Sequence, residues 1–234
     1  MPVVDANGTP LVQDTNERAR EALRTLSKDG VDSAPALAKQ CLEDFVWLWE
    51  ESLEHRPSFV GVRSSFLLGK FRDLAAIHPP AADYLEQQAE RITRLIENKR
   101  ATAKDVRDLA ALQQTRGKQD DTVSSMRTLM EHQPELAAAV GAHLWRTWVQ
   151  TESWDLFERF PPVFEELTSI LRAVTEKTPP EVRQLAKTHP EMLETISANS
   201  GFPSFDAIVN AYKMSGQKDL AQQLLERESE LRAY

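Results

Sequence analysis

The sequence predicts an all-α protein, an α-solenoid in which antiparallel helix pairs stack into a right-handed superhelix. Two observations support this prediction. From Thr15 onward, apolar residues recur at i, i+3, i+4 and i+7, the spacing of one helix face, and strict alternation is nearly absent. Prolines, glycines and capping residues separate these runs with short turns. Such punctuation predicts about twelve short helices, as in stacked helix pairs.

Residues 1–14 show no helical periodicity and contain Asn7-Gly8, so we expect a flexible N-terminal lead there. Residues 15–234 are expected to form a single elongated helical-repeat domain. A subdivision near residue 100 is left open.

Capping residues and prolines mark the helix boundaries in the first half. The first helix is expected to stop at Gly30, and Pro35 lies in the first turn of the second. The pair Pro79-Pro80 opens the fourth helix, and Thr102 caps the fifth. The expected ranges are 15–28, 33–54, 59–77, 79–99 and 102–115.

Prolines also open most helices expected in the second half. A proline fits the first turn because the N–H that it lacks would have no helical partner there. Pro134 opens one such helix, and the pairs Pro161-Pro162 and Pro179-Pro180 open two others. The expected ranges are 119–132, 134–150, 153–159, 162–176, 180–187, 190–198, 203–215 and 217–231.

Composition and charge exclude several classes of protein. Charged residues make up 27% and hydrophobic residues 41%, which is ordinary for a globular protein and excludes a disordered or collagen-like chain. The net charge is −3 over residues 1–100 and −5 over 101–234, so no half is basic. We therefore expect no nucleic-acid partner. The chain has no apolar stretch of membrane-spanning length and no signal-peptide pattern at its start, so we expect neither a membrane partner nor secretion.

No motif predicts catalysis or metal binding. The single cysteine, Cys41, excludes an internal disulfide and a multi-cysteine zinc site, and it favours a cytoplasmic location. Its helical spacing from Phe45 and Leu48 predicts a buried thiol. None of the five histidines has another at i+3 or i+4. We expect no catalytic residue, no metal ligand and no cofactor.

Residues 103–134 have the spacing of a helical repeat, with apolar and small residues in two helices, a glycine between them and a closing proline. These positions are Leu109, Ala110, Gly117, Met126, Leu129 and Pro134. The pattern resembles the tetratricopeptide repeat (TPR). Residues 202–234 are similar, with Tyr212, Gly216 and Ala221 at the family's spacing, and the two glycines lie 99 residues apart, three times 33. The match is incomplete, because Gln113, Thr122 and Val209 depart from the family's preferences.

The resemblance implies a non-enzymatic protein–protein interaction scaffold. In the family, the first helix of each repeat lines a groove that binds a peptide or a partner protein. The polar residues that the resemblance places toward such a groove are Lys104, Arg107, Asp108, Gln114, Asp206, Asn210 and Lys213. At the turns, Gly117 and Gly216 are expected to adopt positive φ, as helix-ending glycines do.

Three residues of the first half support an alternative. Trp47 and Trp49 lie two apart on one helix and so point to opposite sides, toward the core, a second helix or a ligand. Arg63 lies among apolar residues, so it needs a carboxylate partner or binds an anion. An all-α enzyme or a small-molecule binder with a pocket near these residues is therefore an alternative. A helix-mediated homodimer is a third.

Overall fold

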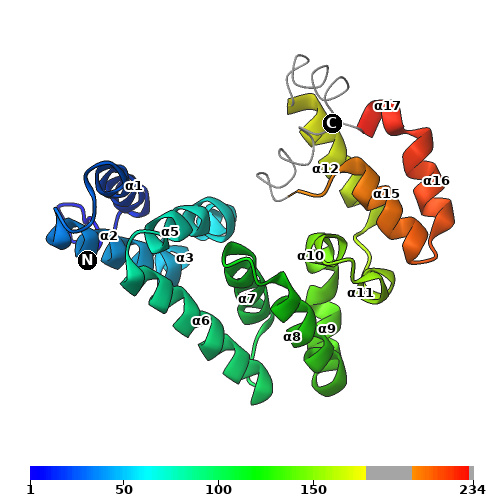
Figure 1. Ribbon diagram of the computed structural model, residues 1–234, viewed down its shortest axis with the longest axis horizontal. Coiled ribbons are helices and arrows are strands. Elements are labelled where there is room, and N and C mark those ends of the chain that lie inside the picture. Colours follow the sequence, from blue (N-terminus) through cyan, green and yellow to red (C-terminus); the bar gives the residue numbers. More distant parts are fainter. Residues whose placement is uncertain (178–201, 232–234) are drawn as a thin grey trace. The chain divides into compact units, whose positions relative to one another are not determined.

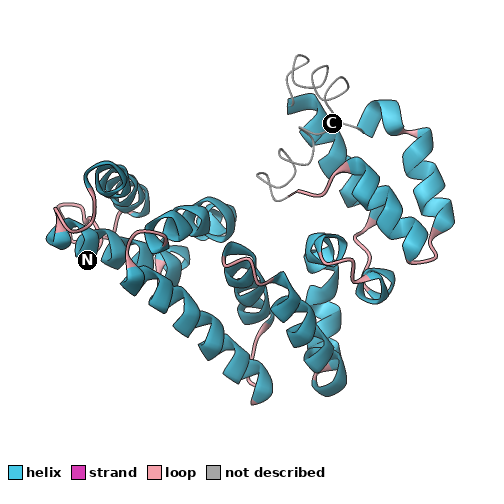
Figure 2. Cartoon of the chain, in the orientation of Figure 1, coloured by secondary structure: helices cyan, strands magenta, loops and turns pink. Residues whose placement is uncertain are grey.

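The computed structural model describes residues 1–177 and 202–231. Over these residues the protein is all α-helical, which confirms the predicted fold class (Figure 2). The β structure in this part of the chain is one isolated bridge between Val4 and Pro10. No helix in it is long and apolar enough to cross a membrane. The helices expected at 180–187 and 190–198 lie outside the described residues.

The chain divides into two compact units, Met1–Lys118 and Gln119–Tyr234, and each is described by itself. The boundary falls inside the repeat-like segment 103–134, between its two helices. The stacking of helix pairs into one superhelix therefore stays a prediction.

The first unit is built around four helices, α1 (Val12–Asp29), α2 (Pro35–Glu50), α5 (Leu68–Ala75) and α6 (Pro79–Glu97), which pack on one another in chain order. A fifth helix, α7 (Ala103–Thr115), packs against α5 and α6. Aromatic rings join three of these helices, because Phe71 stacks between Phe45 and Tyr84 with ring centroids 5.5 and 5.4 Å apart. Figure 1 labels the longer helices of this unit, whose elements in chain order are α1 (Val12–Asp29), α2 (Pro35–Glu50), α3 (Ser52–His55), η1 (Pro57–Phe59), α4 (Val60–Val62), η2 (Arg63–Leu67), α5 (Leu68–Ala75), α6 (Pro79–Glu97) and α7 (Ala103–Thr115).

Two helices expected to be continuous in this unit are interrupted. The range 33–54 breaks after Glu50, and 59–77 becomes η1, α4, the π-helical turn η2 and α5. Gly61 and the pair Ser64-Ser65 lie at this irregular stretch. Glycine and serine favour the helix weakly, and helix kinks are concentrated at glycine–serine pairs and at π-bulges.

In the second unit, α8 (Gln119–His132) packs against α9 (Pro134–Gly141) and α10 (Trp145–Gln150). Helix α15 (Phe205–Met214) packs against α10, α11 (Trp154–Arg159) and α16 (Lys218–Glu226). Phe157 of α11 meets Tyr212 of α15 edge to face, with centroids 5.0 Å apart. Its described elements are α8 (Gln119–His132), α9 (Pro134–Gly141), η3 (Ala142–Leu144), α10 (Trp145–Gln150), α11 (Trp154–Arg159), α12 (Phe164–Lys177), α15 (Phe205–Met214), α16 (Lys218–Glu226) and α17 (Glu228–Leu231).

The helix expected over 134–150 is broken at residues 142–144 for a visible reason. The indole Nε1 of Trp148 donates to the carbonyl of Gly141 at 3.0 Å, inside the core. In a continuous α-helix that carbonyl would accept from the N–H of Trp145. The range 217–231 is also divided, into α16 and α17, at Arg227.

The two repeat-like turns close in the same way. Gly117 and Gly216 have φ of +68° and +80°, so the predicted positive φ is confirmed. In each turn the next residue donates its N–H to a carbonyl five residues back, from Lys118 to Gln113 and from Gln217 to Tyr212, both at 2.8 Å. These are the bonds of a Schellman helix end.

Lys99 and Glu152 make the same kind of helix end without glycine. Their φ angles are +55° and +52°. Arg100 N–H donates to Leu95 at 2.8 Å, and Ser153 N–H donates to Trp148 at 2.9 Å. A left-handed residue with a side chain is strained, which makes these positions targets for a stability test.

The lead segment before α1 forms a closed turn. The Asp5 carboxylate accepts backbone N–H bonds from Thr9 and Asn7 at 2.9 and 2.8 Å, which lower the pKa of Asp5, the bond from Thr9 more than that from Asn7. Leu11 N–H donates to Val3 O at 2.8 Å, so the segment returns on itself before α1 begins.

Candidate binding groove

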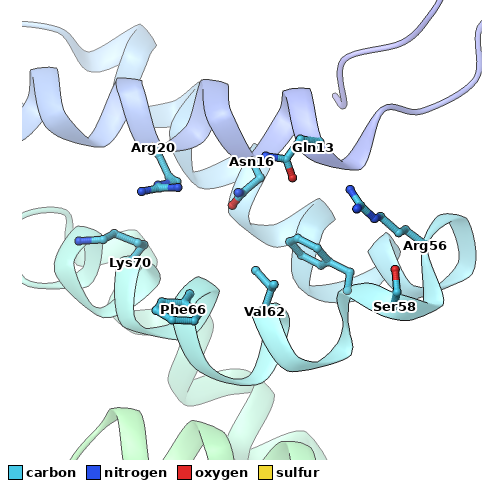
Figure 3. A pocket seen from close by; sticks show the side chains of 9 residues that line it. Gln13, Asn16, Arg20, Arg56, Ser58, Val62, Phe66 and Lys70 are labelled. Carbon is cyan, nitrogen blue, oxygen red and sulfur yellow. The ribbon is translucent and has the colours of Figure 1, made fainter. Parts of the chain in front are cut away.

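A hollow of about 410 Å³ lies in the first unit, between α1 and the stretch from η1 to α5 (Figure 3). Two helix faces form its sides. Its lining residues are Gln13, Asn16, Arg20, Arg56, Ser58, Phe59, Val62, Phe66 and Lys70.

The spacing of the lining residues follows from helix geometry. Gln13, Asn16 and Arg20 lie at i, i+3 and i+7 and share one face of α1. On the other side, Val62 and Phe66 are four residues apart across the π turn, in which Arg63 points inward and is 3% exposed. The π turn therefore separates an inward arginine from an outward phenylalanine that borders the hollow.

The hollow has an apolar floor. Phe59 is buried, Val62 is half-buried, and Phe66 is 77% exposed. Single exposed apolar residues are common on proteins. Here the exposed Phe66 ring adjoins Phe59 and Val62 in the floor of the hollow, and such continuous apolar surface is typical of interaction sites.

Cations stand at both ends of this floor. Figure 3 shows Arg20 and Lys70 at one end and Arg56 at the other. Within the described residues, Arg20 and Arg56 form no ion pair, whereas Lys70 contacts the half-buried Asp73 carboxylate at 2.8 Å. Two guanidinium groups are thus available to an anion in the hollow.

A second hollow of about 430 Å³ shares Arg20 and Lys70 with the first and continues along α1 past Arg24 and Lys28. We call the two hollows together the basic groove. Five cations and a single carboxylate, Asp73, line it. The charge is local, because residues 1–118 contain 17 basic and 18 acidic residues.

Of the four α7 residues that the resemblance placed toward a groove, three are exposed and one is buried. Lys104, Arg107 and Gln114 are exposed. Asp108 is only 9% exposed and belongs to the interior of the unit. Its carboxylate cannot face a partner, because it binds Arg63 inside the unit and Lys104 at its edge, the latter at 3.0 Å.

The other three residues of that set, Asp206, Asn210 and Lys213, are exposed on α15 in the second unit. They lie at i, i+4 and i+7, so they share one face of that helix. The α7 and α15 residues belong to different units, and their meeting in one groove stays a prediction.

Arg63 has the carboxylate partner that its apolar surroundings predict. Its two terminal nitrogens donate to the two Asp108 oxygens at 2.6 and 2.9 Å, and Nε donates to Trp49 O at 2.6 Å. The guanidinium also lies 3.6 Å from the centre of the Trp49 ring. It is therefore fully engaged in the interior and is not an anion site.

Both tryptophans of α2 are packing residues. Trp49 lies beneath Arg63, and Trp47 stacks on His55 with centroids 5.6 Å apart while its Nε1 donates to Glu51 at 2.8 Å. The first half does contain a hollow, as the alternative required. Its lining, however, excludes Trp47, Trp49 and Arg63.

The groove is suited to holding a ligand by charge and apolar contact. Ser58 is the hydroxyl in its lining, and no histidine or carboxylate lines the first hollow beside it to act as a base. Across the described ranges, no three potential metal ligands gather. Cys41 is buried, as predicted, and burial raises its pKa to about 12.

Comparison of the chain with protein-family models, with curated proteins and with solved structures finds no match.

Proposed function

We propose that this protein is a non-enzymatic interaction scaffold whose first unit binds a segment of a partner protein in the basic groove. The observation that carries the proposal is the alternation of apolar floor and unpaired arginines along one continuous hollow. Aromatic residues and arginines supply most of the energy at protein interfaces. Phe66 and the two arginines provide that combination on one surface.

The helix ends support a repeat-like scaffold. The turns at Gly117 and Gly216 share φ sign, hydrogen-bond pattern and a following helix. Helical repeats present extended binding surfaces, and interaction is their usual duty. The exposed faces of α7 and α15 are therefore secondary candidates for a binding surface. Charge reversal at Arg107 tests the α7 face, whereas reversal at Lys104 would also disturb the ion pair with Asp108.

A small anionic ligand is the second candidate. The first hollow, at about 410 Å³, falls within the usual size range of small-molecule pockets. A protein segment is favoured because the groove continues through a second hollow of similar size, beyond the reach of a compact ligand.

Photocrosslinking from the groove tests the proposal. Phe66 would be replaced by benzoylphenylalanine in the native host, and covalent adducts would be identified by mass spectrometry. We expect a discrete protein adduct that disappears when Arg20→Glu is added. The control carries the same crosslinker at Met214, which is 58% exposed in the second unit. Equal adducts from both positions, or none from position 66, would contradict the proposal.

A further inference from the structure

The basic groove arranges its charges and its apolar surface in a fixed order along α1. Arg56 lies at one end of the first hollow, and Arg20 and Lys70 lie at the other (Figure 3). Val62 lies between these ends, and the buried Phe59 also lines this hollow. A bound segment therefore meets a cation, then apolar surface, then two further cations.

The second hollow extends this order. Arg20, Arg24 and Lys28 follow one another at intervals of four residues, so they lie along one face of α1. From Gln13 to Lys28 the helix rises about 22 Å. An extended chain covers that distance with about seven residues, and its alternate side chains, about 6.6 Å apart, face the same side.

We propose, on the basis of the proposed function, that the occupant is an acidic extended segment of a partner protein. Its groove-facing side chains are a carboxylate at Arg56, an apolar side chain on the floor, a carboxylate between Arg20 and Lys70, and another near Arg24. The exposed pair that Arg24 forms with Glu21, at 2.9 Å, has to yield to this last carboxylate. Arginine suits this role because its planar fork binds both oxygens of a carboxylate.

Charge favours a short segment over a polyanionic surface. The chain carries a net charge of −8, and residues 119–234 contain 11 basic and 18 acidic residues. A membrane or a nucleic acid presents many negative charges over a wide area, so the negative net charge of the chain would repel it. A seven-residue segment mainly meets charges within the screening length of about 8 Å, where the lining is positive.

Synthetic peptides test this inference by fluorescence anisotropy on the full chain. The probe is a labelled heptapeptide with Glu at positions one, five and seven, Phe at three and Ser elsewhere, made also in reverse order. The first control peptide carries Gln in place of each Glu and so lacks the charges. The second control peptide keeps the charges but has Phe moved to its end. We expect the Glu peptide, in one of its two directions, to bind at least about tenfold more tightly than either control, and to weaken with salt.

Variants of the groove locate the binding. Arg20→Glu and Arg56→Glu are each expected to weaken the Glu peptide about tenfold. Arg100→Glu, an exposed arginine of the same unit outside the groove, is the matched control and is expected to leave binding unchanged. Circular dichroism melts of each variant show whether a loss of binding reflects a loss of fold.

The outcomes separate this inference from the proposed function. Equal binding of the Glu and Gln peptides would overturn the inference, as would tighter, Arg20-dependent binding of phosphatidylserine vesicles or of a single-stranded oligonucleotide. If the Glu peptides fail to bind while position 66 still crosslinks a partner at a non-acidic segment, the inference falls and the scaffold stands. If crosslinking fails as well, both fall.

Discussion

Arg63 and Asp108, 45 residues apart in the chain, form a two-point ion pair in the interior of the first unit. Their side chains are 4% and 12% exposed. The pair joins η2 to α7, and the Nε bond to Trp49 O adds α2. One arginine therefore connects three elements, one of which, η2, also contributes Phe66 to the basic groove.

Removal of the carboxylate should destabilise the first unit. Asp108→Ala leaves the Arg63 charge buried without its partner, and breaking a buried pair costs about 3–5 kcal/mol. We expect a clear fall in the free energy of unfolding, measured in urea. Lys104→Ala, which removes the exposed partner of the same carboxylate, should cost no more than about 1 kcal/mol. Similar losses for the two variants would contradict the assignment.

Gly141 should tolerate no side chain. A Cβ at this position would lie 2.6 Å from Cδ1 of Phe160 and 2.9 Å from the terminal methyl of Met126. Gly141→Ala is expected to lower stability by about 1–3 kcal/mol through overpacking, visible as a lower Tm. Gly69→Ala is the control, because a Cβ there meets nothing within 4 Å. That helical change should be neutral or stabilising by up to about 1 kcal/mol.

Glycine should stabilise the positive-φ helix ends at residues 99, 117, 152 and 216. Introducing it at 99 and 152 should therefore raise stability, and removing it at 117 and 216 should lower stability. Lys99→Gly and Glu152→Gly relieve strain at positive φ and should stabilise by up to about 1 kcal/mol, less the entropy that glycine adds to the unfolded chain. Gly117→Ala and Gly216→Ala introduce the same strain and should cost about 1 kcal/mol. Thermal melts of the four variants check this, and a loss at Lys99→Gly would speak against it.

Cys41 should be inert in the folded protein. Burial, followed by the nearby Asp44 charge, raises the pKa of its thiol to about 12. The reactive thiolate is therefore scarce at pH 8, and it becomes abundant only as the pH approaches 12. A disulfide reagent such as Ellman's should react slowly with the native chain and rapidly in urea. Fast native reaction at pH 8 would show that the thiol is accessible.

Much of the fold follows from local signals in the sequence. Helical periodicity and proline placement predicted the all-α class, and glycine predicted the positive φ at residues 117 and 216. The ends at Lys99 and Glu152 escaped the same reasoning, because their side chains carry no left-handed preference. The break at Gly141 depends on a bond from Trp148, seven residues on, which helical periodicity cannot reveal.

The basic groove was harder to predict. Arg20, Arg24 and Lys28 are spaced for one face, but Glu21 lies between them and Glu17 and Asp29 flank them, so the net charge of this stretch is close to zero. Arg56 and Lys70 join them only through folding. The four-residue spacing of these basic residues could have predicted a positively charged face on this helix. The low net charge of the segment concealed that pattern.

The tryptophans give each unit its own optical reporter. Trp47 and Trp49 belong to the first unit, and Trp145, Trp148 and Trp154 to the second. Replacing the first two by phenylalanine would leave emission from the second unit alone, and the complementary triple change would do the reverse. Fluorescence from such a pair of proteins can establish whether the units melt in one transition or in two.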